Sequence, residues 1–196
     1  LSLRLPIVLI FMSFVIYSFH YSAKEFGSII PGAISALILV ASSGFVTYHM
    51  LKTGDHDVPF AIYLSFCLLF LHRFFERDRS KDLILFTFFF LAALLTKNVM
   101  AGLIAPGVIL FIVFKGDFIR YLKDFRVIGS IAFIIGIYIS FLLYYNFQQP
   151  WFIEKMWTNE LIRRYTEGYG GHNKASYFYL DVLLNEKMMP FLYLLP

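Results

Sequence analysis

Ionisable side chains are scarce in this sequence of 196 residues, and three groups of them stand beside long apolar runs. The first group falls in residues 52–57 (KTGDHD), where Asp55, His56 and Asp57 come shortly before Pro59. Two carboxylates and an imidazole suit general acid–base catalysis, metal coordination or the binding of hydroxyl groups. Asp57 also has a structural use, because aspartate commonly caps a helix that has proline in its first turn. Both interpretations of Asp57 stay open on the sequence alone.

The second group is built around one lysine, Lys97, which stands in Thr96-Lys97-Asn98 between two apolar runs. A lysine at such a place can extend its amine to the membrane surface while its carbon chain stays among apolar groups. It can also serve as a point charge for an anionic head group. Lys52 has the same two interpretations.

The third group lies in residues 151–166, whose two tryptophans, large apolar residues and scattered charges predict a helix at the membrane interface. At about 100° per residue, Glu160 and Arg164 fall inside the apolar arc of this helix and are spaced for an i,i+4 ion pair. Such a pair is either structural or an anion site, because the planar guanidinium matches phosphate oxygens. His172, in the glycine-rich loop that follows, is either a site residue or an ordinary loop residue.

The elements that position these groups must be membrane helices. Hydrophobic residues make up 59% of the chain and charged residues 15%, with a mean hydropathy of +0.70. A soluble domain has about 25% charged residues, so this chain has too little polar surface to cover a core in water. Its single cysteine, Cys67, excludes a disulfide scaffold. The fold class predicted is an all-α, polytopic transmembrane helical bundle that forms a single domain.

Apolar runs predict about six membrane crossings, followed by an outer segment at 146–187 and the start of a further span at 188–196. One helix over 83–114 would be about 48 Å long, against a hydrocarbon core of about 30 Å, so we expect this run to break into a hairpin at residues 96–98. The predicted crossings are residues 5–19, 29–51, 58–75, 83–95, 99–114 and 127–145.

The distribution of lysine and arginine predicts the orientation. Loops 20–28, 72–82 and 115–126 hold nine of these residues in 32 positions, whereas the alternate loops hold eight in 55. The positive-inside rule therefore places the first set in the cytoplasm and the three ionisable groups on the outward side. Since residues 72–82 mix both signs of charge, we expect them to form a solvated connector.

Motifs for other chemistries are missing from the sequence. It contains no glycine-rich phosphate loop, HExxH, CxxC or serine-nucleophile elbow. The sequence therefore offers no residues that would form a binding site for a soluble nucleotide sugar or for ATP. The net charge of +4 is explained largely by topology, so no nucleic-acid partner is expected.

The order of the polar motifs resembles the GT-C membrane glycosyltransferases of the protein O-mannosyltransferase and aminoarabinose (lipid A) transferase superfamily, over Leu5 to Pro196. The motifs that carry this resemblance are Gly54-Asp55-x-Asp57, Leu95-Thr96-Lys97, Asn159-Glu160-x-x-x-Arg164-Tyr165, His172-x-x-x-x-Tyr177-x-Tyr179-Leu180 and Met189-Pro190.

The resemblance implies a GT-C type helical bundle with an outward-facing interfacial helix and loop. It implies a polyprenyl-phosphate sugar donor and transfer to a lipid, glycan or protein acceptor on the outer (periplasmic or extracytoplasmic) face of the inner or plasma membrane. The roles it implies are Asp57 and Asp55 in catalysis, Lys97 and Arg164 at the donor phosphate, and Glu160, His172 and His56 in support.

Two departures from the family pattern affect these expectations. The family's main catalytic aspartate would precede Leu1, so we expect this chain to be an internal fragment that is inactive by itself. Some relatives have a metal-binding histidine where this chain has Leu161, so no metal site of that kind is predicted. No cofactor is otherwise assigned, and a divalent metal bound by other ligands stays open.

Two other functions are compatible with the same residues. A transporter or flippase of an anionic lipid-linked substrate would use the same positive groups without chemistry. A purely structural membrane subunit would leave the outward carboxylates and Lys97 without a role. Transporters commonly contain inverted repeats and helices broken near mid-bilayer. The sequence has no visible repeat, and its polar groups stand at the outer boundary, which favours the transferase.

Overall fold

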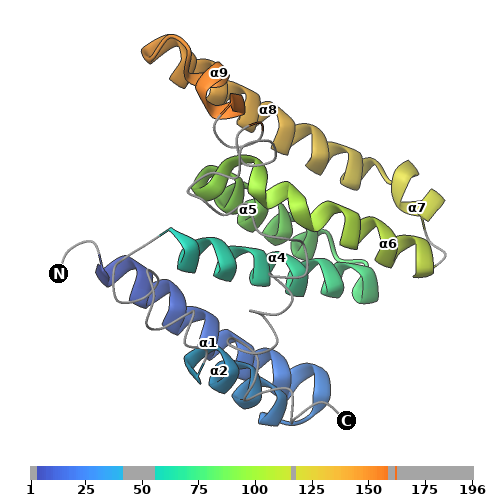
Figure 1. Cartoon of the computed structure of the whole chain (residues 1–196). Helices are drawn as coiled ribbons and strands as arrows, with labels where there is room; N and C mark the ends of the chain where they lie inside the picture. Colours follow the sequence, from blue (N-terminus) through green and yellow to red (C-terminus); the bar gives the residue numbers. More distant parts are fainter. Residues whose placement is uncertain (1–3, 42–55, 116–117, 159–161, 163–196) are drawn as a thin grey trace, which may run out of the picture. The chain divides into compact units, whose positions relative to one another are not determined.

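A computed structural model of the chain describes residues 4–41, 56–115, 118–158 and 162. All regular secondary structure in these residues is helical (Figure 1), which agrees with the expected all-α fold. The chain divides into two compact units, each described here by itself. The first contains α1 (Arg4–Phe26), α2 (Ile30–Ala41) and the beginning of α4 (Asp57–Arg77), up to Ile62. The second contains the rest of α4 and the helices that follow it.

Three helices are long and apolar enough to cross a membrane, namely α1, α4 and α8 (Phe125–Gln148). The 24 residues of α8 extend about 36 Å at about 1.5 Å per residue, which exceeds a hydrocarbon core of about 30 Å. Shorter apolar helices cover 30–40 and 100–114. The chain is therefore a membrane protein by the length and composition of its helices, while the six crossings and their orientation stay predictions.

In the first unit, α1 and α2 pack side by side as a helical hairpin (Figure 1). Gly27 allows the tight turn with a φ of +66°. The buried hydroxyl of Ser22 donates a hydrogen bond to the Ser28 carbonyl at 2.6 Å and accepts one from the Gly32 amide at 3.0 Å. A Cβ on Gly32 would lie 2.6 Å from the carbonyl oxygen of Ser18, so only glycine permits this approach of the two helices.

In the second unit, α5 (Ser80–Lys97) packs against α8 (Figure 1), and the hydroxyls of Thr87 and Ser130 are hydrogen-bonded across the contact. The ring of Phe66 on α4 stacks on Phe89 of α5 with centroids 4.6 Å apart. The remaining helices of this unit are the 3-10 helix η1 (Asn98–Ile104), α6 (Ala105–Lys115), α7 (Phe118–Lys123) and α9 (Phe152–Trp157).

The core of the second unit is aromatic. Phe75 lies 4.8 Å from Tyr121 between ring centroids, and Phe74 lies 5.8 Å from the same ring. Leu71 and Leu83 complete this buried cluster. This cluster joins the end of α4 to the beginning of α5 and to α7. The polar residues that connect these helices therefore lie beside a packed core.

Candidate functional site

Among the residues expected at a site, His56, Asp57 and Lys97 belong to the part of the chain that the structure describes. Asp57 belongs to the first compact unit and Lys97 to the second. The other predicted site residues, Asp55, Glu160, Arg164 and His172, lie outside the described residues. Their roles therefore stay predictions.

Asp57 is the first residue of α4 and is half-buried, whereas His56 before it is exposed. The carbonyl of His56 accepts a hydrogen bond from the Phe60 amide at 3.1 Å, so the first turn of the helix starts at His56. The carboxylate of Asp57 thus stands in the first helical turn, where the positive end of the helix dipole favours negative charge. Pro59 follows in the same turn, where its missing amide hydrogen costs nothing.

Lys97 is the last residue of α5 and is half-buried. The helix ends there because Asn98 adopts a φ of +48°, and this end coincides with the break expected at residues 96–98. The hydroxyl of Thr96 donates to the Ala92 carbonyl at 2.6 Å, so it is used within its own helix. At this end of α5 the ammonium of Lys97 is the group that can attract an anion.

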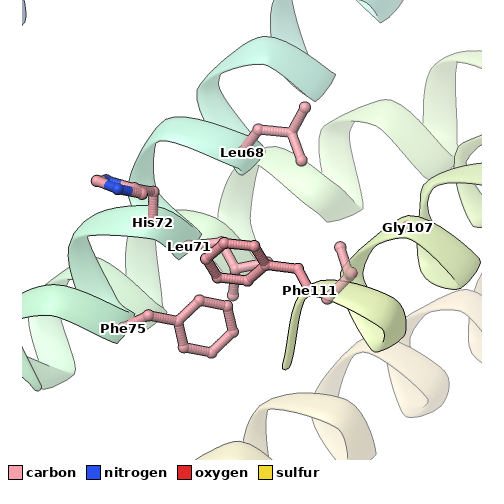
Figure 2. Close-up of a pocket in the computed structure, with 7 residues that line it drawn as sticks. Leu68, Leu71, His72, Phe75, Gly107 and Phe111 are labelled. Carbon is pink, nitrogen blue, oxygen red and sulfur yellow. The ribbon is translucent and has the colours of Figure 1, made fainter. Parts of the chain in front are cut away.

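A small apolar pocket lies between α4 and α6, with a volume of about 230 Å³ (Figure 2). Leu68, Leu71 and Phe75 come from α4, and Phe111 comes from α6. Figure 2 shows His72 at the edge of this apolar group. Because a sugar needs polar partners for its hydroxyls, such a wall suits a hydrocarbon chain better. The sequence signal for this pocket was the spacing of residues 68, 72 and 75, which share one helical face.

The expectation of a solvated connector at residues 72–82 holds only in part, because residues 78–81 are exposed but the rest of the range belongs to helices. Residues up to Arg77 continue α4, Ser80 begins α5, and the carboxylate of Asp82 is 1% exposed. Its partner Arg73 is 11% exposed, with Nε 3.3 Å from the Asp82 carboxylate oxygen Oδ1. Two of these opposite charges, Arg73 and Asp82, are therefore paired inside the protein, which their alternation along the chain does not reveal.

A second ionic cluster joins the turn between α4 and α5 to the turn between α7 and α8. Arg126 binds Asp78 at 2.5 Å and Asp124 at 2.7 Å, and Arg120 binds Asp78 at 2.7 Å. Asp124 also caps α8 by accepting from the Arg126 amide at 2.9 Å. The hydrogen bond from the Arg126 side chain lowers the pKa of the Asp124 carboxyl below its ordinary value. These ion pairs hold the ends of the helices together. Because both carboxylates are paired with arginines, the cluster provides no nucleophile or general base.

The predicted interfacial helix is described only at its start, where α9 runs from Phe152 to Trp157. Trp151, which precedes the helix at the N-cap position, adopts a φ of +77°. The buried side chain of Met156 lies 4.0 Å from the Tyr138 hydroxyl of α8. Within the described ranges, no group of three histidine, cysteine or acidic side chains is arranged to hold a metal ion.

The helices and their composition define a membrane protein, and the comparison with known families defines its class. Residues 1–145 match the family model described as dolichyl-phosphate-mannose-protein mannosyltransferase. The chain belongs to this family of membrane glycosyltransferases with a lipid-linked sugar donor, which confirms the expected GT-C resemblance. The match includes the positions of Asp57 and Lys97 and ends before the outer segment. No characterised protein and no solved structure matches the chain significantly.

Proposed function

We propose that the full-length protein transfers a sugar from a polyprenyl-phosphate donor to a lipid, glycan or protein acceptor at the outer face of the cell membrane. The observation that carries this proposal is the family match over residues 1–145. The scarcity of polar groups within the helices supports a donor whose long hydrocarbon tail stays in the bilayer.

Lys97 is proposed to bind the phosphate of the donor. The C-terminal end of a helix carries a partial negative charge, which by itself repels an anion. A half-buried ammonium at that end therefore supplies the charge that this site needs. Burial also strengthens its attraction for phosphate, because the effective dielectric constant is lower than in water. Arg164 is proposed as the second phosphate ligand, and its bidentate fork would fix the orientation of the phosphate.

Asp57 is proposed to act at the sugar. In the reaction, the acceptor hydroxyl oxygen attacks the anomeric carbon while the bond from that carbon to the phosphate oxygen breaks. The hydroxyl proton passes to a general-base carboxylate, and the phosphate leaves on its lipid with an additional negative charge. Asp57, with Asp55, would orient the acceptor and this carboxylate, while Lys97 stabilises the leaving phosphate. His56, Glu160 and His172 are proposed to line the same outer region.

Donor kinetics of Lys97 variants test this assignment in the full-length protein. We expect Lys97→Ala to lower kcat/KM for the polyprenyl-phosphate sugar by about 10- to 100-fold, and Lys97→Arg to retain more of it. The matched control is Lys24→Ala, which removes an exposed lysine from the last turn of α1. Equal kinetics for Lys97→Ala and the control would show that Lys97 does not bind the donor.

A further inference from the structure

A groove of about 480 Å³ runs along the contact between α5 and α8, within the second compact unit. Its wall is formed mainly by large apolar side chains, Leu83, Ile84, Phe88, Leu91 and Phe133. Ile84 and Phe88 expose more than half of their surface, at 67% and 61%. Because α8 is long and apolar enough to cross a membrane, we expect an apolar surface beside it to be covered either by hydrocarbon or by protein.

The hydroxyl groups in the middle of the groove form their hydrogen bonds within the protein, so they do not require a polar ligand. The Thr87 hydroxyl donates to the Leu83 carbonyl at 2.8 Å and is hydrogen-bonded to the Ser130 hydroxyl. At one end, the guanidinium of Arg126 is held by Asp78 and Asp124. The interior of the groove therefore suits an unsubstituted hydrocarbon chain.

The length of the groove fits one acyl chain in one leaflet. It extends along α5 from Ser80 to Leu91. At about 1.5 Å of rise per residue this is about 16 Å. Half of a hydrocarbon core of about 30 Å is about 15 Å.

The charge at the Ser80 end indicates which head group accompanies that chain. Arg79, Lys81 and Lys123 are exposed there and have no carboxylate partner among the described residues. Lys81 is seven residues before Phe88, so the two share one stripe of α5 at the edge of the groove. Lys123 immediately precedes the residue that caps α8. Lysine and arginine beside a membrane helix attract anionic phospholipids.

We propose that the groove between α5 and α8 binds one acyl chain of an anionic phospholipid, whose phosphate lies among Arg79, Lys81 and Lys123. The lipid fills the groove and bridges the beginnings of α5 and α8. This site is separate from the proposed donor site at the other end of α5, and it does not depend on the sugar-transfer activity.

Photolabelling of the full-length protein in nanodiscs tests the proposal. The probes are phosphatidylglycerol and phosphatidylcholine, each with a diazirine in one acyl chain, and labelled positions are mapped by mass spectrometry. We expect phosphatidylglycerol to label residues 80–91 and 126–133 at least about threefold more than phosphatidylcholine. Equal labelling by both probes, or no labelling because protein covers the groove, would overturn the proposal.

Two pairs of variants test the binding of the acyl chain and the binding of the lipid head group separately. Ile84→Trp fills the groove and should lower the labelling by at least about half, whereas Leu85→Trp, at an exposed position that does not line the groove, should not. The double variant Lys81→Gln/Lys123→Gln should remove the preference for phosphatidylglycerol, whereas Lys24→Gln on α1 should retain it. If Ile84→Trp leaves the labelling unchanged, or the double variant keeps the preference, the proposal is wrong.

Discussion

Removing the buried arginine Arg73 should destabilise the second compact unit strongly. Its partner Asp82 is 1% exposed, and the Arg73 Nε and both carboxylate oxygens of Asp82 are buried without a hydrogen bond of good geometry among the described residues. The 3.3 Å ion pair with Arg73 compensates the desolvated charge of Asp82. Breaking a buried pair by removing one partner costs about 3–5 kcal/mol, because the other charge stays uncompensated. We expect Arg73→Met to lower the free energy of unfolding by that amount.

Replacing both partners should cost much less than replacing one. In Arg73→Met/Asp82→Leu no charge is left buried, and such replacements by apolar residues are often neutral or stabilising. We therefore expect the double variant to lie within about 2 kcal/mol of the wild type. The contact of the Arg73 guanidinium with the Phe70 ring, at 5.9 Å, is lost in both variants and cancels in the comparison between them.

The assay is equilibrium unfolding in mild detergent, measured for the wild type, Arg73→Met, Asp82→Leu and the double variant. Arg79→Met is the matched control, because Arg79 is exposed and a surface change of this kind alters stability by about 0.5 kcal/mol or less. If Arg73→Met were no more destabilising than Arg79→Met, the pair would not be compensating buried charge. If the double variant were as unstable as Arg73→Met, the loss would come from packing and the reasoning would be refuted.

Asp124→Asn should keep the cap of α8, since asparagine is as good a cap as aspartate, but lose the charge. The pKa of Asp124 is lowered in the folded state, so its contribution is present above the ordinary carboxyl pKa and is lost as the pH falls through the lowered value. The free energy of unfolding, measured as a function of pH, should therefore decline less on the acid side in the variant than in the wild type. Identical profiles for the two proteins would contradict this. Gly32→Ala should destabilise the hairpin of α1 and α2 by about 1–3 kcal/mol, because its Cβ would meet the Ser18 carbonyl. Gly136→Ala in α8 meets nothing and should be neutral or stabilising in thermal unfolding, so an equal effect of both changes would argue against the close approach.

The all-helical membrane character of the chain followed from its sequence, because too few polar residues are available to cover a core in water. The end of α5 was also predictable, since a single helix continued to residue 114 would be longer than the bilayer core is thick. Asn98 then supplies a residue type that tolerates the positive φ found there.

The ion pairs were not predictable, because they depend on how different helices pack. Arg73 and Asp82 stand on α4 and α5, and Arg126 reaches Asp78 across 48 positions of sequence. A mixture of charges looks the same in a solvated loop and in a set of paired side chains. The candidate site could likewise be predicted only in part. Residue types and order suggested its members, and Asp57 does stand in the first turn of α4, as the proline after it indicated. The roles of Asp57 and Lys97 stay predictions.

The most direct test of the central claim uses the full-length protein in proteoliposomes with a radiolabelled polyprenyl-phosphate hexose, comparing the wild type with Asp57→Asn. We predict that the wild type releases free polyprenyl phosphate and that the variant loses most of this release, because Asp57 is proposed to orient the reacting groups. Label that crosses the bilayer with its sugar–phosphate bond intact would mean a flippase and would contradict the proposed transferase. Release that is equal in both proteins would contradict the role of Asp57.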